Sequence, residues 1–181
     1  MIRQKQLGLA VGCLSCFLLI TGCQSNEAGK DVRVNKAVVL LEPTQNHRVR
    51  GMVSFTATES GVRIVADVEG LTPGKHGFHI HEKGDCSAPD ASSAGGHFNP
   101  TNLHHGAPDV EDRHLGDLGN LEADSKGYAH YDRIDKVIVL HGANSIVGKA
   151  VIVHEKEDDL TSQPVGNAGG RVACGVIEVA N

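Results

Sequence analysis

Histidines are the residues of this chain that most clearly could do chemistry. The sequence has 11 His among 181 residues, and an imidazole can ligate a metal or titrate near neutral pH. His79 and His81 stand two apart in a segment expected to be a strand, where residues at that spacing point to the same face. Both rings could therefore reach one ion, although a His-x-His pair alone is a weak signal for metal binding.

A second group of ligand-type residues follows in a stretch rich in Gly and Pro. It contains His97, His105, His114 and Asp117, and His and Asp converging from a loop are typical of a closed tetrahedral zinc site. Any one of these histidines alone is more simply explained as a solvated loop residue. With His154 on a later expected strand, the chain offers six His and one Asp, which is more than chance loops supply, so we predict a metal centre.

The elements that must position these residues are short strands. Aromatic content is 3%, there is no Trp and there are 22 Gly, which favours a core of Val, Ile, Leu and Ala with many turns. Residues 61–68 alternate apolar and polar side chains, the period of a half-buried antiparallel strand. The expected strands are 36–41, 48–58, 61–68, 75–81, 117–123, 128–134, 149–154 and 171–179. About eight such strands predict an all-β sandwich or barrel.

Two irregular stretches, residues 82–116 and 155–170, interrupt the strands. A loop as long as the first is uncommon inside a compact domain unless it is functional or fastened. This loop carries Cys86 and three of the seven candidate ligands, His97, His105 and His114, so both explanations are available.

Five segments, in order, resemble the copper–zinc superoxide dismutases. They are Gly77–Glu82, Gly96–Pro100, Arg113–Asn120, Val153–Lys156 and Gly166–Ile177, and the resemblance extends over roughly residues 36–180. It implies an eight-stranded Greek-key β-sandwich or barrel with long metal-binding loops. It also implies the dismutation of two superoxide anions, with two protons, to dioxygen and hydrogen peroxide by Cu(II)/Cu(I) cycling.

The same resemblance implies a ligand set. Copper would be bound by His79, His81, His97 and His154, and zinc by His97, His105, His114 and Asp117, with His97 as a bridging imidazolate. A set of nitrogen ligands is also what Cu(II) prefers. We choose His105 over the adjacent His104 because its His-Gly-x-Pro context matches the family.

Further roles carry over to three residues. Asp158 matches an outer carboxylate that accepts hydrogen bonds from one copper ligand and one zinc ligand and so fixes both rings; otherwise it is part of a surface charge run. Arg171 matches the guiding arginine that holds the anion beside copper; otherwise it is a strand-end residue in a surface ion pair. The catalytic residues implied are Arg171 and His97, whose imidazole can supply a proton.

One departure from the best-known cytosolic members concerns the substrate channel. The stretch from His154 to Arg171 is shorter, with residues 161–164, Thr-Ser-Gln-Pro, where a longer charged loop is usual. The residues that steer the substrate besides Arg171 stay open, with Lys156 as a candidate. A second function class, a copper-carrying or metal-buffering lipoprotein on the same fold, is less favoured because every ligand and Arg171 are present.

The first 22 residues read as a targeting segment. Arg3 and Lys5 precede an apolar stretch over 7–20, as in a secretory signal. The sequence then ends this segment with Ile20–Cys23, which resembles a bacterial lipobox; the alternatives are an uncleaved anchor helix or a signal cut elsewhere. We expect a signal peptide at 1–22, a lipidated Cys23 and tether over 23–35, and the metal-binding domain over 36–181.

Export of the protein predicts the state of its cysteines and the net charge of its mature chain. Cys13 and Cys16 leave with the signal and Cys23 carries lipid, so Cys86 and Cys174 remain as an even pair and a disulfide is expected. Loss of two positive charges takes the formal net charge from -5 to -7, and an acidic domain is a poor partner for nucleic acid. We expect a membrane-anchored lipoprotein of the periplasm or cell envelope, and a homodimer is an open expectation.

Overall fold

The computed structural model describes residues 34–180, and its regular structure is β apart from one short 3₁₀ turn, η1 (Ser92–Ala94). The strands are β1 (Lys36–Pro43), β2 (Arg50–Thr58), β3 (Gly61–Glu69), β4 (Gly74–His81), β5 (Asp117–Ala123), β6 (Ala129–Asp135), β7 (Ala150–His154), β8 (Arg171–Val176) and β9 (Glu178–Val179). The predicted all-β class is confirmed. No helix in this part of the chain could cross a membrane. The predicted signal, lipobox and most of the tether lie outside the described residues.

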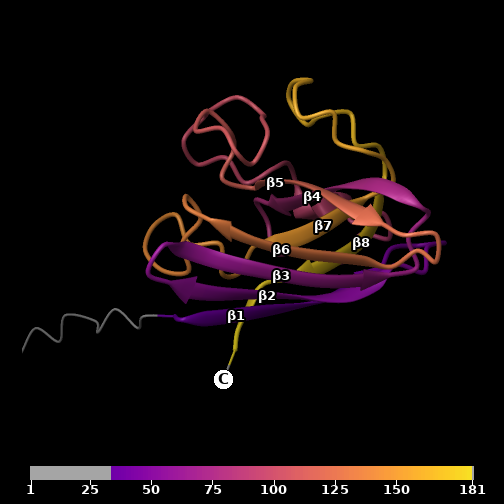
Figure 1. The fold of residues 1–181 in the computed structure, drawn as a ribbon, viewed down its shortest axis with the longest axis horizontal. Coiled ribbons are helices and arrows are strands. Elements are labelled where there is room, and N and C mark those ends of the chain that lie inside the picture. Colours follow the sequence, from indigo (N-terminus) through magenta and orange to yellow (C-terminus); the bar gives the residue numbers. More distant parts are fainter. Residues whose placement is uncertain (1–33, 181) are drawn as a thin grey trace, which may run out of the picture. The chain divides into compact units, whose positions relative to one another are not determined.

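The strands form one antiparallel sheet that closes on itself. Their order is β2-β3-β6-β5-β4-β7-β8-β1, and β1 also pairs with β2, which closes an eight-stranded barrel. β3 connects to β4 past β6 and β5, and β6 connects to β7 past β5 and β4, as in a Greek key. Figure 1 shows β1, β2, β3 and β6 side by side along one wall. Closure leaves only the short β9 as an additional strand, paired with β1.

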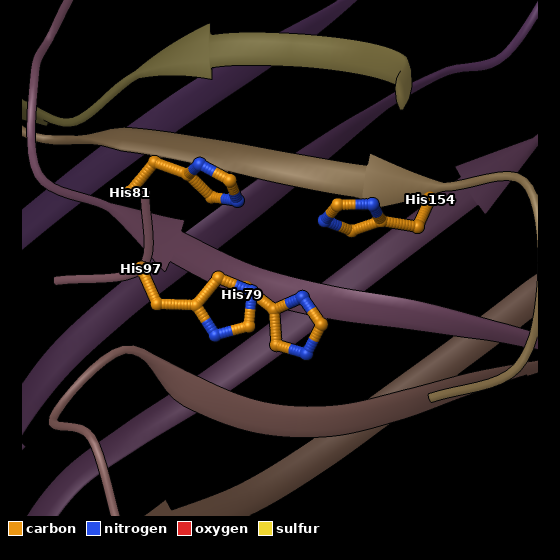
Figure 2. A group of neighbouring side chains, drawn as sticks. All are labelled: His79, His81, His97 and His154. Atoms are coloured by element: carbon orange, nitrogen blue, oxygen red, sulfur yellow. The ribbon is translucent and has the colours of Figure 1, made fainter. Parts of the chain in front are cut away.

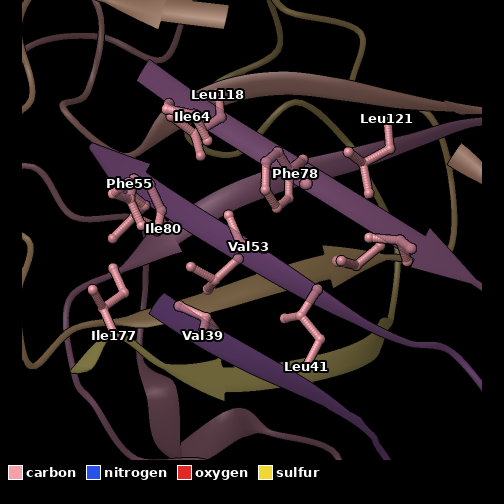
Figure 3. Packing of buried hydrophobic residues seen from close by; sticks show 14 of the residues in the cluster. Val39, Leu41, Val53, Phe55, Ile64, Phe78, Ile80, Leu118, Leu121 and Ile177 are labelled. Atoms are coloured by element: carbon pink, nitrogen blue, oxygen red, sulfur yellow. The ribbon is translucent and has the colours of Figure 1, made fainter. Parts of the chain in front are cut away.

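The barrel interior is filled by the apolar positions of the alternating strands. On β3, Val62, Ile64, Ala66 and Val68 are all buried, as the period-two pattern predicts. Figure 3 shows side chains from several strands meeting inside the barrel, among them Phe78 of β4. Burying this apolar surface is the main favourable contribution to folding.

The last predicted strand, 171–179, is wrong as a single element. The structure divides it into β8 and β9 at Ile177. The side chain of Ile177 is buried, its N–H donates to the Lys149 carbonyl at 2.8 Å, and its carbonyl accepts from Gly148. This residue therefore stays bonded to the chain before β7, while β9 pairs with β1. A sequence pattern does not show such a change of partner.

A disulfide fastens the first long loop to the barrel, which confirms the expected pairing. Cys86 and Cys174 are bonded, with their Cα atoms 5.9 Å apart. Beneath the loop lies a small second apolar cluster, made of Ala91, Ala94, Ala150, Ile152 and Cys174. The segment after Cys86 is thus held against β7 and β8 by both a covalent bond and packing.

β4 has two buried faces, and this places the histidines. Phe78 and Ile80 point into the barrel core, whereas His79 and His81 lie on the outer face and are nevertheless 0% and 1% exposed. On β7, Val153 likewise points inward and His154 outward, again buried. The two long loops, 82–116 and 155–170, cover this outer face and rise on the same side of the barrel in Figure 1. The candidate site therefore lies between the barrel wall and its loops.

Candidate metal centre

Four histidines from two strands and a loop form the first ligand group. His79 and His81 come from β4, His154 from the end of β7, and His97 from the loop, where it forms an isolated β-bridge with His81. One ring nitrogen of each lies within 4.8 Å of those of the others. Figure 2 shows the four rings turned toward a common space.

The nitrogens that face this space have no partner in the protein. His79 Nδ1, His81 Nε2, His97 Nε2 and His154 Nε2 are buried and make no hydrogen bond. Buried polar atoms are almost always paired, so four orphans converging on one point need an explanation. A metal ion bound by four nitrogens supplies it, and that donor set suits copper.

The opposite nitrogen of each of three of these rings is held by the protein. His79 Nε2 lies 2.8 Å from Asp158 Oδ2, His81 Nδ1 donates to the Gly95 carbonyl at 2.9 Å, and His154 Nδ1 donates to the Gly169 carbonyl at 3.3 Å. Such bonds fix the tautomer and the ring orientation and leave the other nitrogen free as a ligand.

The second ligand group surrounds one oxygen of Asp117. Its Oδ1 lies 2.8 Å from His97 Nδ1, 3.0 Å from His105 Nδ1 and 3.2 Å from His114 Nδ1. The contact to His105 lacks hydrogen-bond geometry, since that nitrogen counts as unpartnered. Ligands at 2.0–2.1 Å from a tetrahedral ion stand about 3.3 Å apart, so the spacing fits zinc with an N₃O set.

His97 belongs to both groups and uses a different nitrogen in each. Its Nδ1 faces Asp117 and lies 3.4 Å from His114 Nδ1, whereas its Nε2 is the orphan that faces His79, His81 and His154. One imidazole therefore stands between two metal-sized spaces, which is the arrangement of a bridging ligand.

The charge state of the buried groups favours metal binding. Burial lowers the pKa of His97 to about 4, despite its hydrogen bond to Asp117, and lowers the pKa of His154 to about 3. Both rings are therefore neutral at pH 7, which is the form that ligates. Burial opposes ionisation of Asp117, but its contacts with His105, His114 and His97 hold its pKa far below the usual range. His105 is the exception among the rings: burial opposes its protonation, yet its contacts with the Asp117 and Asp158 carboxylates raise its pKa to about 9, so a metal ion has to displace a proton from it.

Asp158 bonds to one residue of each ligand group, as the family resemblance implied for an outer carboxylate. It is fully buried; its Oδ2 accepts from His79 and its Oδ1 from His105 Nε2 at 2.9 Å. Its own backbone is held by Asn120, whose carboxamide donates to the Asp158 carbonyl and accepts from its N–H at 2.9 and 2.8 Å. The sequence analysis gave Asn120 no role, and its residue type alone carries no signal for one.

Arg171 lies at the start of β8, paired with His154 at the end of β7. Its Nη1 donates to the Ala91 carbonyl and its Nη2 to the Gly95 carbonyl, both at 2.6 Å. Gly95 also accepts from His81, so one carbonyl separates this cation from a ligand ring. Arg171 forms no ion pair with a carboxylate within residues 34–180, which is unlike the surface pair considered as the alternative.

The remaining histidines lie outside both ligand groups. His104, the neighbour of His105, is exposed and stands 3.5 Å from Asp112. His130 is exposed and bonds to Asp67. His76 is buried and donates from Nδ1 to the His154 carbonyl at 2.8 Å, so it supports the backbone of a ligand. The structure thus brings together the seven predicted ligands and leaves His104 aside.

Comparisons with known proteins agree with this geometry. The family model described as copper/zinc superoxide dismutase (SODC) matches residues 49–177. The extracellular superoxide dismutase [Cu-Zn] of Drosophila melanogaster is 45% identical over 176 residues, covering 92% of this chain and 96% of the relative. That of Brugia pahangi is 44% identical over 153 residues, covering 80% and 76%. The crystal structure of the clock protein EA4 superposes with a TM-score of 0.75 at 42% identity, covering 81% of this chain and 95% of that one.

Proposed function

This chain belongs to the copper/zinc superoxide dismutase family, and we propose that its two ligand groups form the metal centre of that enzyme. Superoxide is its substrate, copper and zinc are its cofactors, and it acts outside the cytoplasm. The observation that carries the residue assignment is His97, which offers one nitrogen to each ligand group.

The donor sets assign the metals. Copper would be held by His79, His81, His97 and His154, all through nitrogens that are otherwise unpartnered, and zinc would be held by His97, His105, His114 and Asp117. When bound, copper supplies the one-electron chemistry that turns two superoxide anions and two protons into dioxygen and hydrogen peroxide.

The chain's own residues bind the anion and move a proton. Arg171 holds a guanidinium beside the ligand group, oriented by two loop carbonyls, and can hold superoxide through a charge-assisted hydrogen bond. When it is not bound to copper, His97 can hold a proton at Nε2, because Nδ1 faces the zinc side. That nitrogen faces the copper group, so the proton is delivered where the reduced substrate needs it.

Metal analysis and a superoxide-consumption assay test this proposal together. We expect one copper and one zinc per chain, His154→Ala to lose copper chiefly, and His97→Ala to disturb both sites. A copper-carrying or metal-buffering lipoprotein on this fold would bind both metals and consume no superoxide. Full occupancy and a normal copper spectrum in His97→Ala would show that the bridge assignment is wrong.

We also propose that the chain is a lipoprotein. The support is Ile20–Cys23 after a positively flanked apolar segment. The relatives from Drosophila melanogaster and Brugia pahangi are named extracellular superoxide dismutases. A lipidated Cys23 at the end of a 1–22 signal, with a tether to residue 35, would hold the domain at a membrane of the periplasm or cell envelope.

We further propose a homodimer through the outer face of β1 and β2. Leu40 and Met52 are directly opposite in the ladder and are 67% and 53% exposed. Tyr128, 45% exposed, bonds to Asp67, the residue that pairs with Met52 on its other side. Monomers seldom expose contiguous apolar patches. Sedimentation equilibrium should give twice the chain mass, and Leu40→Glu should halve it; a monomeric wild-type protein would refute the proposal.

A further inference from the structure

The loop between β7 and β8 holds the backbone of one proposed zinc ligand through a single side chain. The side-chain Oε1 of Gln163 accepts from the backbone N–H of His105 at 2.8 Å, and its Nε2 donates to the backbone carbonyl of the same residue, also at 2.8 Å. One carboxamide thus satisfies both main-chain groups of a single residue, as a neighbouring strand does in a sheet.

Within residues 34–180, no main-chain group bonds to the backbone of His105. Its ring is completely buried in the zinc group, 3.0 Å from Asp117 at the start of β5, but its backbone belongs to the irregular loop 82–116 and to no strand. Buried backbone groups need partners, and at this position the partner comes from a loop 58 residues later in the chain. The two bonds from Gln163 therefore fix the position of the His105 backbone.

The segment that carries Gln163 is itself compact. Asp159 accepts from the N–H groups of Thr161 and Ser162 at 3.0 and 2.7 Å and from the Asn167 carboxamide at 3.0 Å. Its own N–H donates to the Gly166 carbonyl at 2.9 Å, which closes the turn. The turn can therefore present Gln163 at a fixed place.

The same segment also holds the ring of His105. Asp158, at its start, accepts from His105 Nε2 at 2.9 Å. Gly166, at its end, has φ +68, and a Cβ there would come within 2.6 Å of that nitrogen. His105 is thus hydrogen-bonded at its ring by Asp158 and at its backbone by Gln163, and both residues belong to one turn.

We propose that Gln163 is a positioning residue for the zinc site, which it serves by clamping the backbone of His105 to the loop that carries Asp158. The proposal rests on the zinc assignment made above. The loop between β7 and β8 thereby holds His105 at both its backbone and its ring. Loosening the clamp loosens zinc first, because none of the four copper-group residues bonds to Gln163.

Zinc release from the metal-loaded protein to a chromogenic chelator tests the clamp. Gln163→Ala removes both bonds, and Gln163→Glu keeps the acceptor for the His105 N–H but turns an oxygen toward its carbonyl. We expect both variants to release zinc about tenfold faster, equivalent to about 1.4 kcal/mol, with copper release unchanged. Gln45→Ala is the matched control, since Gln45 is exposed and its carboxamide bonds to nothing in the described chain.

Two further readouts separate positioning from general stability. With Co(II) in the zinc site, both Gln163 variants should show a changed visible absorption spectrum, and Gln45→Ala should not. The thermal midpoint of the metal-free variants should stay close to that of the wild-type protein. Zinc release and a Co(II) spectrum equal to wild type, or equal acceleration of zinc and copper release with a lower thermal midpoint, would overturn the proposal.

His105→Ala distinguishes this inference from the function on which it rests. If His105→Ala holds zinc as tightly as the wild-type protein, the zinc assignment itself is wrong and the clamp falls with it. If His105→Ala loses zinc while the Gln163 variants behave as wild type, the clamp alone is wrong.

Discussion

In the copper group, the two ring nitrogens of each histidine have different roles. For His79, His81 and His154 the inner nitrogen has no protein partner, and the outer one bonds to a carboxylate or a backbone carbonyl. For His97 both nitrogens face ligand groups. The outer bonds fix ring orientation before metal arrives, so the residues that make them are sensitive points of the site.

Asp158→Asn should weaken both metals at once. The carboxylate accepts from His79 and from His105, and an amide can accept from only one of them while its NH₂ faces the other. Loss of such a partner typically costs 10–100-fold in metal affinity, and we expect about that loss for copper and zinc in chelator competition. Glu157→Gln, at an exposed neighbour paired with Lys75, is the control. Unchanged affinity in Asp158→Asn would contradict the bridging role.

Arg171→Ala should slow the reaction and leave metal content intact. The guanidinium touches loop carbonyls and no ligand atom, so its contribution is to anion capture. Steering raises association rates by 10-fold or more and is screened by salt over about 8–10 Å. The second-order rate should fall about tenfold and lose its dependence on ionic strength. Arg171→Lys, which keeps the charge, should retain that dependence; full activity of Arg171→Ala at low salt would refute the role.

Among the elements, β4 changes partners at the site. Its first half pairs with β5 and its second half with β7, with a register shift between Gly77 and His79. The position of His79 is thus set by strands on both sides. This places two ligands on rigid β structure, while the others depend on loops that need fastening of their own.

Removing the disulfide should unfasten the first loop. In Cys86→Ser/Cys174→Ser the loop of 88 residues opens, and chain entropy puts the loss at about 4–5 kcal/mol, although measured values are often lower. The Ala91 and Gly95 carbonyls that orient Arg171 lie in the freed segment. We expect a lower thermal midpoint, faster metal loss and reduced activity even after remetallation. The same stability and rate as wild type would show that packing alone holds the loop.

The whole molecule is acidic and yet takes an anionic substrate. The formal net charge is -5 for the full chain, so the average field opposes capture. We propose that the local positive charge of Arg171, next to the ligand group, overcomes that field. The placement of one cation matters more here than the total charge.

Cys23→Ser should release the protein from membranes without loss of dismutase activity. The proposed anchor precedes residue 36, and every ligand follows residue 78, so the two functions lie on separate parts of the chain. Fractionation of cells with an activity assay on each fraction measures both. A variant that still sediments wholly with membranes would refute the lipobox interpretation.

The sequence by itself determined the strands, the ligands and the cysteine pair of this protein. Alternation in residues 61–68 marks a strand through burial of every second side chain, a local property. The motif around His79 and His81 and the pairing of Cys86 with Cys174 could likewise be inferred from residue type, spacing and context. The family resemblance named the candidate metal ligands, which the structure brings together in two groups, with the ligand atoms of each group within 4.8 Å of one another.

Only the tertiary structure decided how these pieces are held. The division of the last strand at Ile177 depends on its bond to Lys149, and the roles of Asn120 and Gln163 depend on bonds to residues 38 and 58 positions away. A carboxamide has the same local appearance whether it is solvated or clamps a ligand. Its role arises because folding brings it next to backbone groups that are distant in the sequence. A local sequence pattern carries no information about such contacts.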